Sequence, residues 1–272
     1  MKSFLLKFLS LSLIALLSFK ANDTQEFKGK AYYISKSKMQ LGSWGARLSE
    51  AQKKDVAARL KNRLEKSYVL SFNKEESVFR EEDKLDAISG ATDSWGANFT
   101  RGYQYKNVKD VALVQSQEFY GKKFLVKDKL HTIEWKMGKE TKQIGQYTCF
   151  KATASISQDD LAWYNFSWSD LRRKDEDGDG KPDVPMVEVE AWYSLQVPVS
   201  HGPAEYWGLP GLILEVSAGD TTMLCSKIVI NPDEEIKIKA PTGGKEITKG
   251  KYQETIKEKM QEMMSNRGRR RG

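Results

Sequence analysis

The amino-acid sequence predicts an α+β fold: a predominantly antiparallel β-sheet, curved into an open sheet or half-barrel, with an N-terminal helix and a C-terminal helix. Short runs rich in β-branched and aromatic residues follow one another with turn residues between them. No helical pattern alternates with these runs, as a parallel sheet would require. Strands are predicted at 28–36, 68–72, 77–80, 99–106, 111–119, 122–127, 131–137, 143–155, 161–168, 186–196, 211–218, 221–230 and 234–239.

The first helix is predicted over residues 49–66. Ser49 is followed three residues later by Gln52, which is the spacing of a capping box at a helix N-terminus. A narrow apolar stripe at helical spacing follows, made by Val56, Leu60 and Leu64 with Ala57 beside them. We expect this stripe to pack the helix against one face of the sheet.

The second helix is predicted over residues 249–265, after the turn signal Gly243–Gly244. One side of it is apolar and consists of Tyr252, Ile256, Met260, Met263 and Met264. Thioethers can bind Cu(I), but methionines at helical spacing more often form a packing stripe. The Arg- and Gly-rich residues 266–272 are predicted to form a disordered tail.

The N-terminal residues 1–21 have the pattern of a signal peptide. Lys2 and Lys7 precede an apolar run that is too short to span a bilayer. The sequence therefore predicts export to the periplasm or the medium, with no transmembrane span after signal removal. An uncleaved N-terminal anchor is the alternative. Residues 27–265 are then expected to form a single β-rich domain.

The charge distribution argues against a nucleic-acid partner. The chain has 44 Lys and Arg residues and 37 Asp and Glu residues. Seven of the basic residues lie near the two ends of the chain: Lys2, Lys7, Lys20, Arg267, Arg269, Arg270 and Arg271. The rest of the chain is balanced, whereas a phosphate-binding groove needs its positive excess within the fold.

Cys149 and Cys225 are the two cysteines. Each lies in a strand-like run with a lysine two positions later, so strand periodicity places each cysteine on the same face as its lysine. If the two strands are neighbours, the cysteines can form a cross-strand disulfide in an oxidising compartment. Two buried free thiols are the alternative.

The segment AWYSLQVPVSHGPAEYWGLPGLILEV, from Ala191 to Val216, contains the most distinctive motif of the chain. In its stretch Leu209-Pro210-Gly211-Leu212, proline fixes the first turn torsion and glycine supplies a positive φ, which predicts a type II turn before a buried strand. The functional alternative is an exposed ligand-binding rim formed by His201, Tyr206 and Trp207.

The residues from Gly208 to Ile213 resemble the motif of the GLPGLI family of secreted Bacteroidota proteins. Ala31-Tyr32-Tyr33, Phe119-Tyr120-Gly121 and residues 144–152 are also similar to members of that family. The resemblance covers nearly all of the mature chain and implies a secreted or periplasmic protein. The family has no established activity, so the resemblance transfers no catalytic residue. Residues 157–185 depart from it by being longer and more acidic.

This acidic departure contains a candidate calcium loop, DEDGDGKPD, at residues 175–183. Its predicted ligands are Asp175, Asp177, Asp179 and Asp183, because Ca²⁺ prefers hard oxygen ligands at such alternating positions. Position 12 is Met186 rather than a bidentate Glu, so the loop is similar to thrombospondin type 3 and dockerin-like repeats rather than to an EF-hand. A solvated acidic turn is the alternative.

Motifs for catalysis are weak. The sequence lacks a GxSxG elbow, an HExxH helix, a P-loop and a GxGxxG loop. Its two histidines, His131 and His201, have no metal-ligand spacing. Ser200 beside His201 is not a nucleophile–base pair, because adjacent strand side chains point to opposite faces.

We therefore expect an exported non-enzymatic accessory or binding protein of the cell envelope, whose partner is an envelope protein, a peptide or a glycan bound in the concave face. Exposed aromatic residues would line this face: Trp163, Tyr164, Trp168, Trp192, Tyr206 and Trp207. The alternative is a hydrolase that uses Glu205 and Glu215 as an acid/base pair on an envelope or extracellular polymer.

Overall fold

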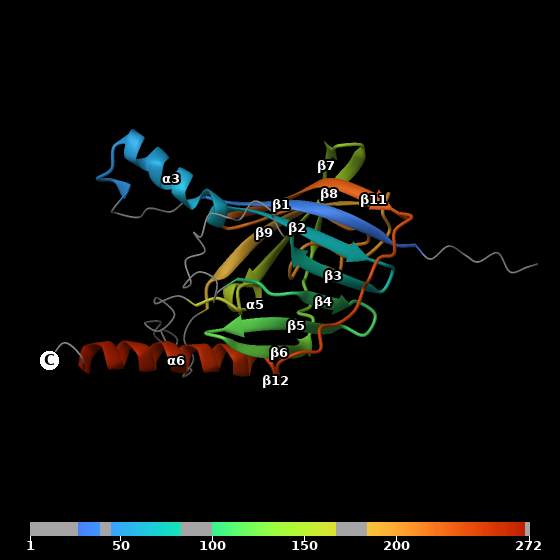
Figure 1. Ribbon diagram of the computed structural model, residues 1–272. Coiled ribbons are helices and arrows are strands. Elements are labelled where there is room, and N and C mark those ends of the chain that lie inside the picture. The colour runs from blue at the N-terminus through green and yellow to red at the C-terminus, as the bar shows by residue number, and fades with distance from the viewer. Residues whose placement is uncertain (1–26, 39–44, 83–99, 167–183, 270–272) are drawn as a thin grey trace, which may run out of the picture.

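The computed structural model describes residues 27–38, 45–82, 100–166 and 184–269 (Figure 1). Its strands are β1 (Gly29–Ser37), β2 (Glu65–Phe72), β3 (Glu76–Glu81), β4 (Gln104–Asn107), β5 (Ala112–Phe119), β6 (Lys122–Lys129), β7 (Lys136–Ile144), β8 (Tyr147–Ser157), β9 (Met186–Ser194), β10 (Leu212–Ala218), β11 (Thr221–Ile230) and β12 (Lys245–Ile247). Its helices are α3 (Glu50–Leu64), α5 (Gln158–Leu161) and α6 (Lys249–Arg269).

The described strands form one 12-stranded sheet in the order β12-β6-β5-β4-β3-β2-β1-β11-β10-β9-β8-β7. Strands β2 to β6 are consecutive neighbours, as are β7 to β11, and β1 joins the two groups by pairing with both β2 and β11. Every pairing is antiparallel except that of β12 with β6. The predicted fold, an open and predominantly antiparallel sheet with one helix toward each end of the chain, is confirmed.

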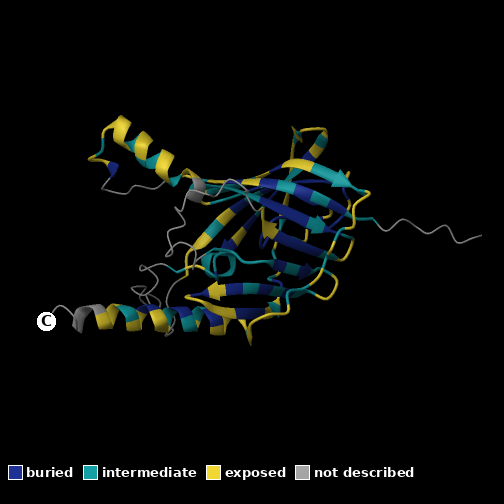
Figure 2. Ribbon diagram, viewed as in Figure 1, coloured by how far each residue is buried: buried dark blue, intermediate teal, exposed yellow. Residues whose placement is uncertain are grey.

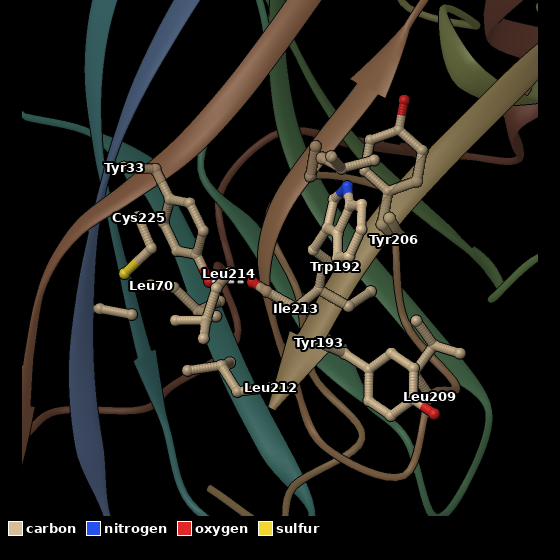
Figure 3. Close-up of a cluster of buried hydrophobic side chains, with 14 of the residues drawn as sticks. Tyr33, Leu70, Trp192, Tyr193, Tyr206, Leu209, Leu212, Ile213, Leu214 and Cys225 are labelled. Carbon is tan, nitrogen blue, oxygen red and sulfur yellow. Dashed lines mark hydrogen bonds between the residues drawn. The ribbon is translucent and has the colours of Figure 1, made fainter. Parts of the chain in front are cut away.

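The buried apolar side chains form two clusters. The larger lies among β1 to β3, β8 to β11 and the connection between β9 and β10. Figure 3 shows part of it, where Tyr33 donates a hydrogen bond of 2.7 Å to the carbonyl of Ile213. The smaller cluster lies among β5, β6, Trp163 and helix α6. The curved sheet is therefore filled from within rather than hollow.

Helix α3 begins as predicted but does not pack as predicted. Ser49 and Gln52 form both hydrogen bonds of the capping box. The helix extends away from the sheet, and none of its described side chains is buried (Figures 1 and 2). The expectation that this helix packs against a face of the sheet is wrong, because three or four small apolar residues are too narrow a stripe to bury it.

Helix α6 packs as predicted along its first half, where Tyr252, Ile256 and Met260 are buried. Beyond that point Met264 is exposed, so the predicted apolar side is buried over only part of its length. The helix continues to Arg269 and therefore includes the first residues of the predicted disordered tail. The helix is therefore four residues longer than predicted, and residues 270–272 lie outside the described residues.

Two predicted strands, at 161–168 and 234–239, are absent where the structure describes the chain. The strand predicted at 131–137 is displaced, since residues 131–135 are not in a strand and β7 begins at Lys136. At 161–168, the described residues follow a helical turn, α5, whose N-cap Ser157 accepts a hydrogen bond from the amide of Asp160. At 234–239, the chain runs from β11 to β12, which are separated in the sheet by six strands. Alternating apolar residues do not form a strand there, because the segment connects two strands that are far apart in the sheet.

Candidate functional site

The connection between β9 and β10, residues 195–211, carries the distinctive motif and is called the inner loop below. It folds back on itself through a β-bridge between His201 and Trp207. The amide of Leu212 donates to the carbonyl of Val197, and the amide of Ile213 donates to the carbonyl of His201. These bonds hold the inner loop against the start of β10 and place residues 201–206 in the interior.

The glycine at the Pro-Gly corner is required for a reason that the sequence did not predict. Gly211 has no positive φ, so the predicted type II turn with glycine at its third position is wrong. A Cβ atom at this position would lie 2.2 Å from the carbonyl oxygen of Ser194, which is a severe clash. The positive φ belongs to Gly208, at 93°. Gly211 is therefore a close-approach glycine that lets the inner loop return onto the end of β9.

His201 lies fully in the interior rather than on an exposed rim. Its Nε2 atom is 3.0 Å from the carbonyl oxygen of Asn73, and its ring packs near Phe72. Burial, together with the nearby Lys106 charge, lowers the pKa of His201 to about 3. Because the Asn73 carbonyl accepts a hydrogen bond, Nε2 carries the proton, and the neutral ring acts as a structural donor.

A buried ion pair fixes the next part of the inner loop. The Glu205 Oε1 atom accepts hydrogen bonds from the Arg101 guanidinium at 2.7 Å, from Gln104 at 3.0 Å and from the Trp163 indole at 3.2 Å. Both charged side chains are only 7% exposed. Burial disfavours the Arg101 charge, but Tyr164 and Glu205 outweigh it and hold the pKa of Arg101 above its usual value. The network joins β4 and the residues before it to the inner loop.

A second cation, Lys106, is fully buried directly beneath the loop. Its Nζ atom donates to the carbonyls of Gly202, Ala204 and Tyr206 at 2.8, 2.7 and 3.2 Å. Burial lowers the pKa of Lys106 to about 7, although the Glu205 carboxylate opposes this shift. All three donors of the ammonium group are thus used to hold loop carbonyls.

The predicted ligand-binding rim of His201, Tyr206 and Trp207 is not exposed as expected. Tyr206 is buried in the larger cluster. Trp207 is half-buried; its indole donates to the carbonyl of His131, and its own carbonyl accepts from the indole of Trp135. The aromatic residues predicted to line an open concave face include two more that are buried, Trp163 and Trp192, and Trp168 lies outside the described residues.

The predicted acid/base pair, Glu205 and Glu215, consists of two carboxylates that are each engaged by a cation. Glu205 pairs with Arg101, and Glu215 accepts from Lys142 at 2.8 Å. General acid or base catalysis requires a carboxyl group that can exchange a proton with a substrate. Because each carboxylate already contacts a cation of the protein, the geometry does not favour the hydrolase alternative.

The two cysteines are free in the structure, and both are buried. Strands β8 and β11, which carry them, are separated by β9 and β10, so the neighbouring-strand condition for a disulfide is not met. The Cys149–Cys225 disulfide is therefore not formed in this structure, which has the two buried free thiols of the alternative. Burial is the largest cause of the raised pKa of each thiol, which is about 11 for Cys149 and about 12 for Cys225.

The predicted calcium ligands Asp175, Asp177, Asp179 and Asp183 lie outside the described residues. Over the described part of the chain, no group of three or more His, Cys, Asp or Glu side chains is arranged to hold a metal ion. A search of the same ranges finds no helix with the length and apolarity needed to cross a membrane.

An open groove lies between the start of α6, the turn α5 and the segment after β6, and is called the α6 groove below. Its volume is about 580 Å³. It is lined by Asp128, Lys129, Leu130, His131, Thr132, Ser157, Asp159, Asp160, Trp163, Lys249, Gly250 and Gln253. The His131 Nδ1 atom lies 3.5 Å from the Asp160 carboxylate, which also accepts from the Ser157 hydroxyl at 2.8 Å. Ser157 and His131 both contact the Asp160 carboxylate rather than each other. Ser157 is therefore not arranged as a nucleophile with His131 as its base.

The α6 groove continues into a smaller pocket between α5 and α6. The two share Asp159 and Gln253, and the smaller pocket adds Asn165 and Lys257 to the polar lining. Most of these residues carry no signal in the sequence, because they come from three segments that only the fold brings together. The same applies to Arg101 and Lys106, whose partners lie about a hundred positions away along the chain.

Comparison with known proteins gives one family match. Residues 135–215 match the family described as "Protein of unknown function (Porph_ging)". The matched region runs from the start of β7 into β10 and includes the whole inner loop. It supports the resemblance at the coarse level of an uncharacterised family. A comparison with curated proteins gives no match.

Two solved structures are similar to the chain at 14% sequence identity. One, described as "Structure of PNGF-II in C2 space group", has a TM-score of 0.47 and covers 85% of this chain and 32% of its own. The other, "Structure of PNGF-II in P21 space group", has a TM-score of 0.43 and covers 77% and 29%. The chain thus spans about a third of the length of these proteins, and likenesses this low carry no argument about its activity.

Proposed function

We propose that this protein is an exported, non-enzymatic binding protein of the cell envelope that holds a neutral, hydroxyl-rich ligand, an oligosaccharide, in the α6 groove. The observation that carries the proposal is the contrast between this open groove and the closed interior. The side chains that the sequence offered for chemistry, His201, Glu205 and Glu215, are all held by internal contacts.

The charges of the α6 groove favour a neutral ligand. Three acidic and three basic side chains line the groove and its extension: Asp128, Asp159, Asp160, Lys129, Lys249 and Lys257. Asp128 accepts from the backbone amide of Lys249, and the Lys249 ammonium lies 5.8 Å from the centre of the Trp163 ring. Because the charges balance, neither a polyanion nor a polycation gains from entering.

The remaining polar groups suit a ligand rich in hydroxyls. The lining includes hydroxyls at Thr132 and Ser157, an amide at Gln253 and the ring of His131, which together offer donors and acceptors. A hydroxyl is both donor and acceptor and can use such a mixed set, whereas a peptide backbone presents its groups in a fixed alternation. A neutral peptide is the competing occupant that the experiment below distinguishes.

Export, envelope location and the calcium loop belong to this proposal as sequence-based predictions. The signal-peptide pattern at residues 1–21 and the acidic motif at residues 175–183 support them. A structural calcium ion in that motif would act separately from the α6 groove, and titration of the full chain with Ca²⁺ and with the Asp177→Ala variant tests it.

Binding of soluble, neutral oligosaccharides such as chitooligosaccharides, measured by calorimetry on the mature chain, tests the proposed site. We expect saturable binding that Gln253→Ala and His131→Ala each weaken. Glu258→Ala is the matched control, because Glu258 lies on the exposed side of the same helix and does not line the groove. Binding of neutral peptides in place of saccharides, or equal affinity in Gln253→Ala and Glu258→Ala, would overturn the proposal.

A further inference from the structure

A second pocket, of about 240 Å³, lies beside β11. It is lined by Ile144, Gly145, Gln146, Tyr147, Leu214, Cys225, Ser226, Lys227 and Ile228. These residues come from the turn between β7 and β8, from β10 and from β11. It shares no lining residue with the α6 groove or with the inner loop.

The pocket exists because two neighbouring strands part. The ladder between β10 and β11 runs from the Ala218–Thr221 pair to the Glu215–Leu224 pair and ends there. Strand β11 continues to Ile230 but pairs over that length with β1 alone. A register shift in β10 between Ile213 and Glu215 accompanies the separation. The turn between β7 and β8 lines the resulting gap opposite β11.

The inner part of the pocket is apolar. Leu214 and Cys225 belong to the larger core cluster, and Ile144, Tyr147 and Ile228 pack against that cluster while remaining partly exposed. Figure 3 shows Leu214 and Cys225 on the Tyr33 side of the cluster. Cys225 does not introduce charge, because burial keeps its thiol protonated. At about 30 Å³ for each water-sized group, the pocket holds a chain of about eight such groups.

One of the residues that line the pocket, Lys227, carries a positive charge. Lys227 is exposed, and its ammonium lies 5.4 Å from the centre of the Tyr32 ring. Among the described residues, no carboxylate forms an ion pair with it. The apolar side chains of the lining together with the exposed cation Lys227 are complementary to a molecule that has a hydrocarbon chain and an anionic head.

We infer that this pocket binds the acyl chain of an anionic amphiphile, with the chain between the β7–β8 turn and β11 and the head group beside Lys227. Two sources supply this chemistry: a free fatty acid and a membrane phospholipid. The full mature chain is titrated calorimetrically with decanoate below its micelle concentration, and is sedimented with phosphatidylglycerol vesicles. Decanoate binding alone identifies a free acid as the ligand, and vesicle binding identifies a lipid.

Two variants and their controls decide the inference. Ile144→Trp fills the pocket from a turn at the surface and is expected to weaken binding roughly tenfold or more, whereas Ile34→Trp, an exposed isoleucine outside the pocket, leaves it unchanged. Lys227→Glu is expected to weaken decanoate binding and to favour decyltrimethylammonium, whereas Lys123→Glu on β6 changes neither. The inference is overturned if the folded protein shows no saturable binding of either probe, or if Ile144→Trp binds as tightly as the native chain.

Discussion

At the scale of single residues, the interior of this protein contains polar groups that would be expected on its surface. His201, Lys106 and Glu205 are all buried, yet each has an internal partner. Buried polar groups of this kind are costly unless their hydrogen bonds are made inside the protein. Their partners are mostly backbone carbonyls and one guanidinium, which indicates a role in holding the chain rather than in binding a substrate.

The buried histidine predicts a dependence of stability on pH. Burial holds the pKa of His201 at about 3, whereas an unfolded histidine has a pKa of about 6.5. Below pH 6.5 the unfolded chain therefore binds a proton that the native chain does not. The stability that neutral His201 contributes is complete above pH 6.5 and is lost as the pH falls toward 3, at up to about 1.4 kcal/mol per pH unit.

Urea unfolding from pH 7 to pH 4 measures this effect. The variant His201→Gln keeps a donor for the Asn73 carbonyl but cannot titrate, so its unfolding free energy is expected to fall less steeply with acid than that of the native chain. His131→Gln removes the half-exposed histidine and serves as the comparison. Parallel pH dependences for the native chain and His201→Gln would show that the buried ring titrates normally.

The residue scale also shows how a correct expectation can rest on a wrong cause. The Pro-Gly pair predicted a sharp corner, and the chain does turn there. The pair did not reveal whether glycine was needed for its torsion or for its lack of a side chain. That depends on Ser194, whose carbonyl oxygen would clash with a Cβ atom at Gly211, and this contact is set by the fold rather than by the local sequence.

At the scale of elements, local signals predicted where helices begin but not where they pack. Both hydrogen bonds of the α3 capping box lie within four consecutive residues, so the local sequence is enough to predict it. Whether a helix packs on the sheet depends on the width of its apolar stripe and on the surface available to it. α6 presents Tyr252, Ile256 and Met260 to β6 and is buried there, whereas α3 presents smaller residues and is not.

The exposed position of α3 predicts that its cap stabilises the helix locally. Removal of the capping hydroxyl in Ser49→Ala is expected to reduce the protection of the α3 amides by about 1 kcal/mol. The global unfolding free energy is expected to change by less than about 0.5 kcal/mol, because no described side chain of the helix is buried. Native-state hydrogen exchange and urea unfolding measure the two quantities.

Gln52→Ala removes the other half of the same capping box and is expected to behave in the same way. An equal loss of about 1 kcal/mol in local protection and in global stability would contradict this account. It would mean that α3 unfolds together with the sheet and is a cooperative part of the core.

At the scale of the whole molecule, the inner loop determines whether the concave face of the sheet is open to a ligand. The sequence predicted a concave face open to a ligand, whereas the structure fills that face with the loop between β9 and β10. The contacts that hold it there join Glu205 to Arg101 and the loop carbonyls to Lys106, across about a hundred residues of chain. Periodicity and turn patterns contain no information at that separation, so the sheet was predictable and its internal closure was not.

The central claim is that the inner loop is a structural plug, held in place by the buried Arg101–Glu205 pair. A double-mutant cycle of Arg101→Met and Glu205→Gln, with unfolding free energies from urea denaturation, tests it most directly.

Each single variant leaves a buried charge without its partner, and its unfolding free energy is expected to fall by about 3–5 kcal/mol. The loss in the double variant is expected to be smaller than the sum of the two single losses. The exposed pair Lys66–Glu81 gives the matched control, expected to contribute no more than about 1 kcal/mol. Single variants at Arg101 and Glu205 as stable as the native chain would contradict the claim, because the pair would then be kept for something other than holding the loop.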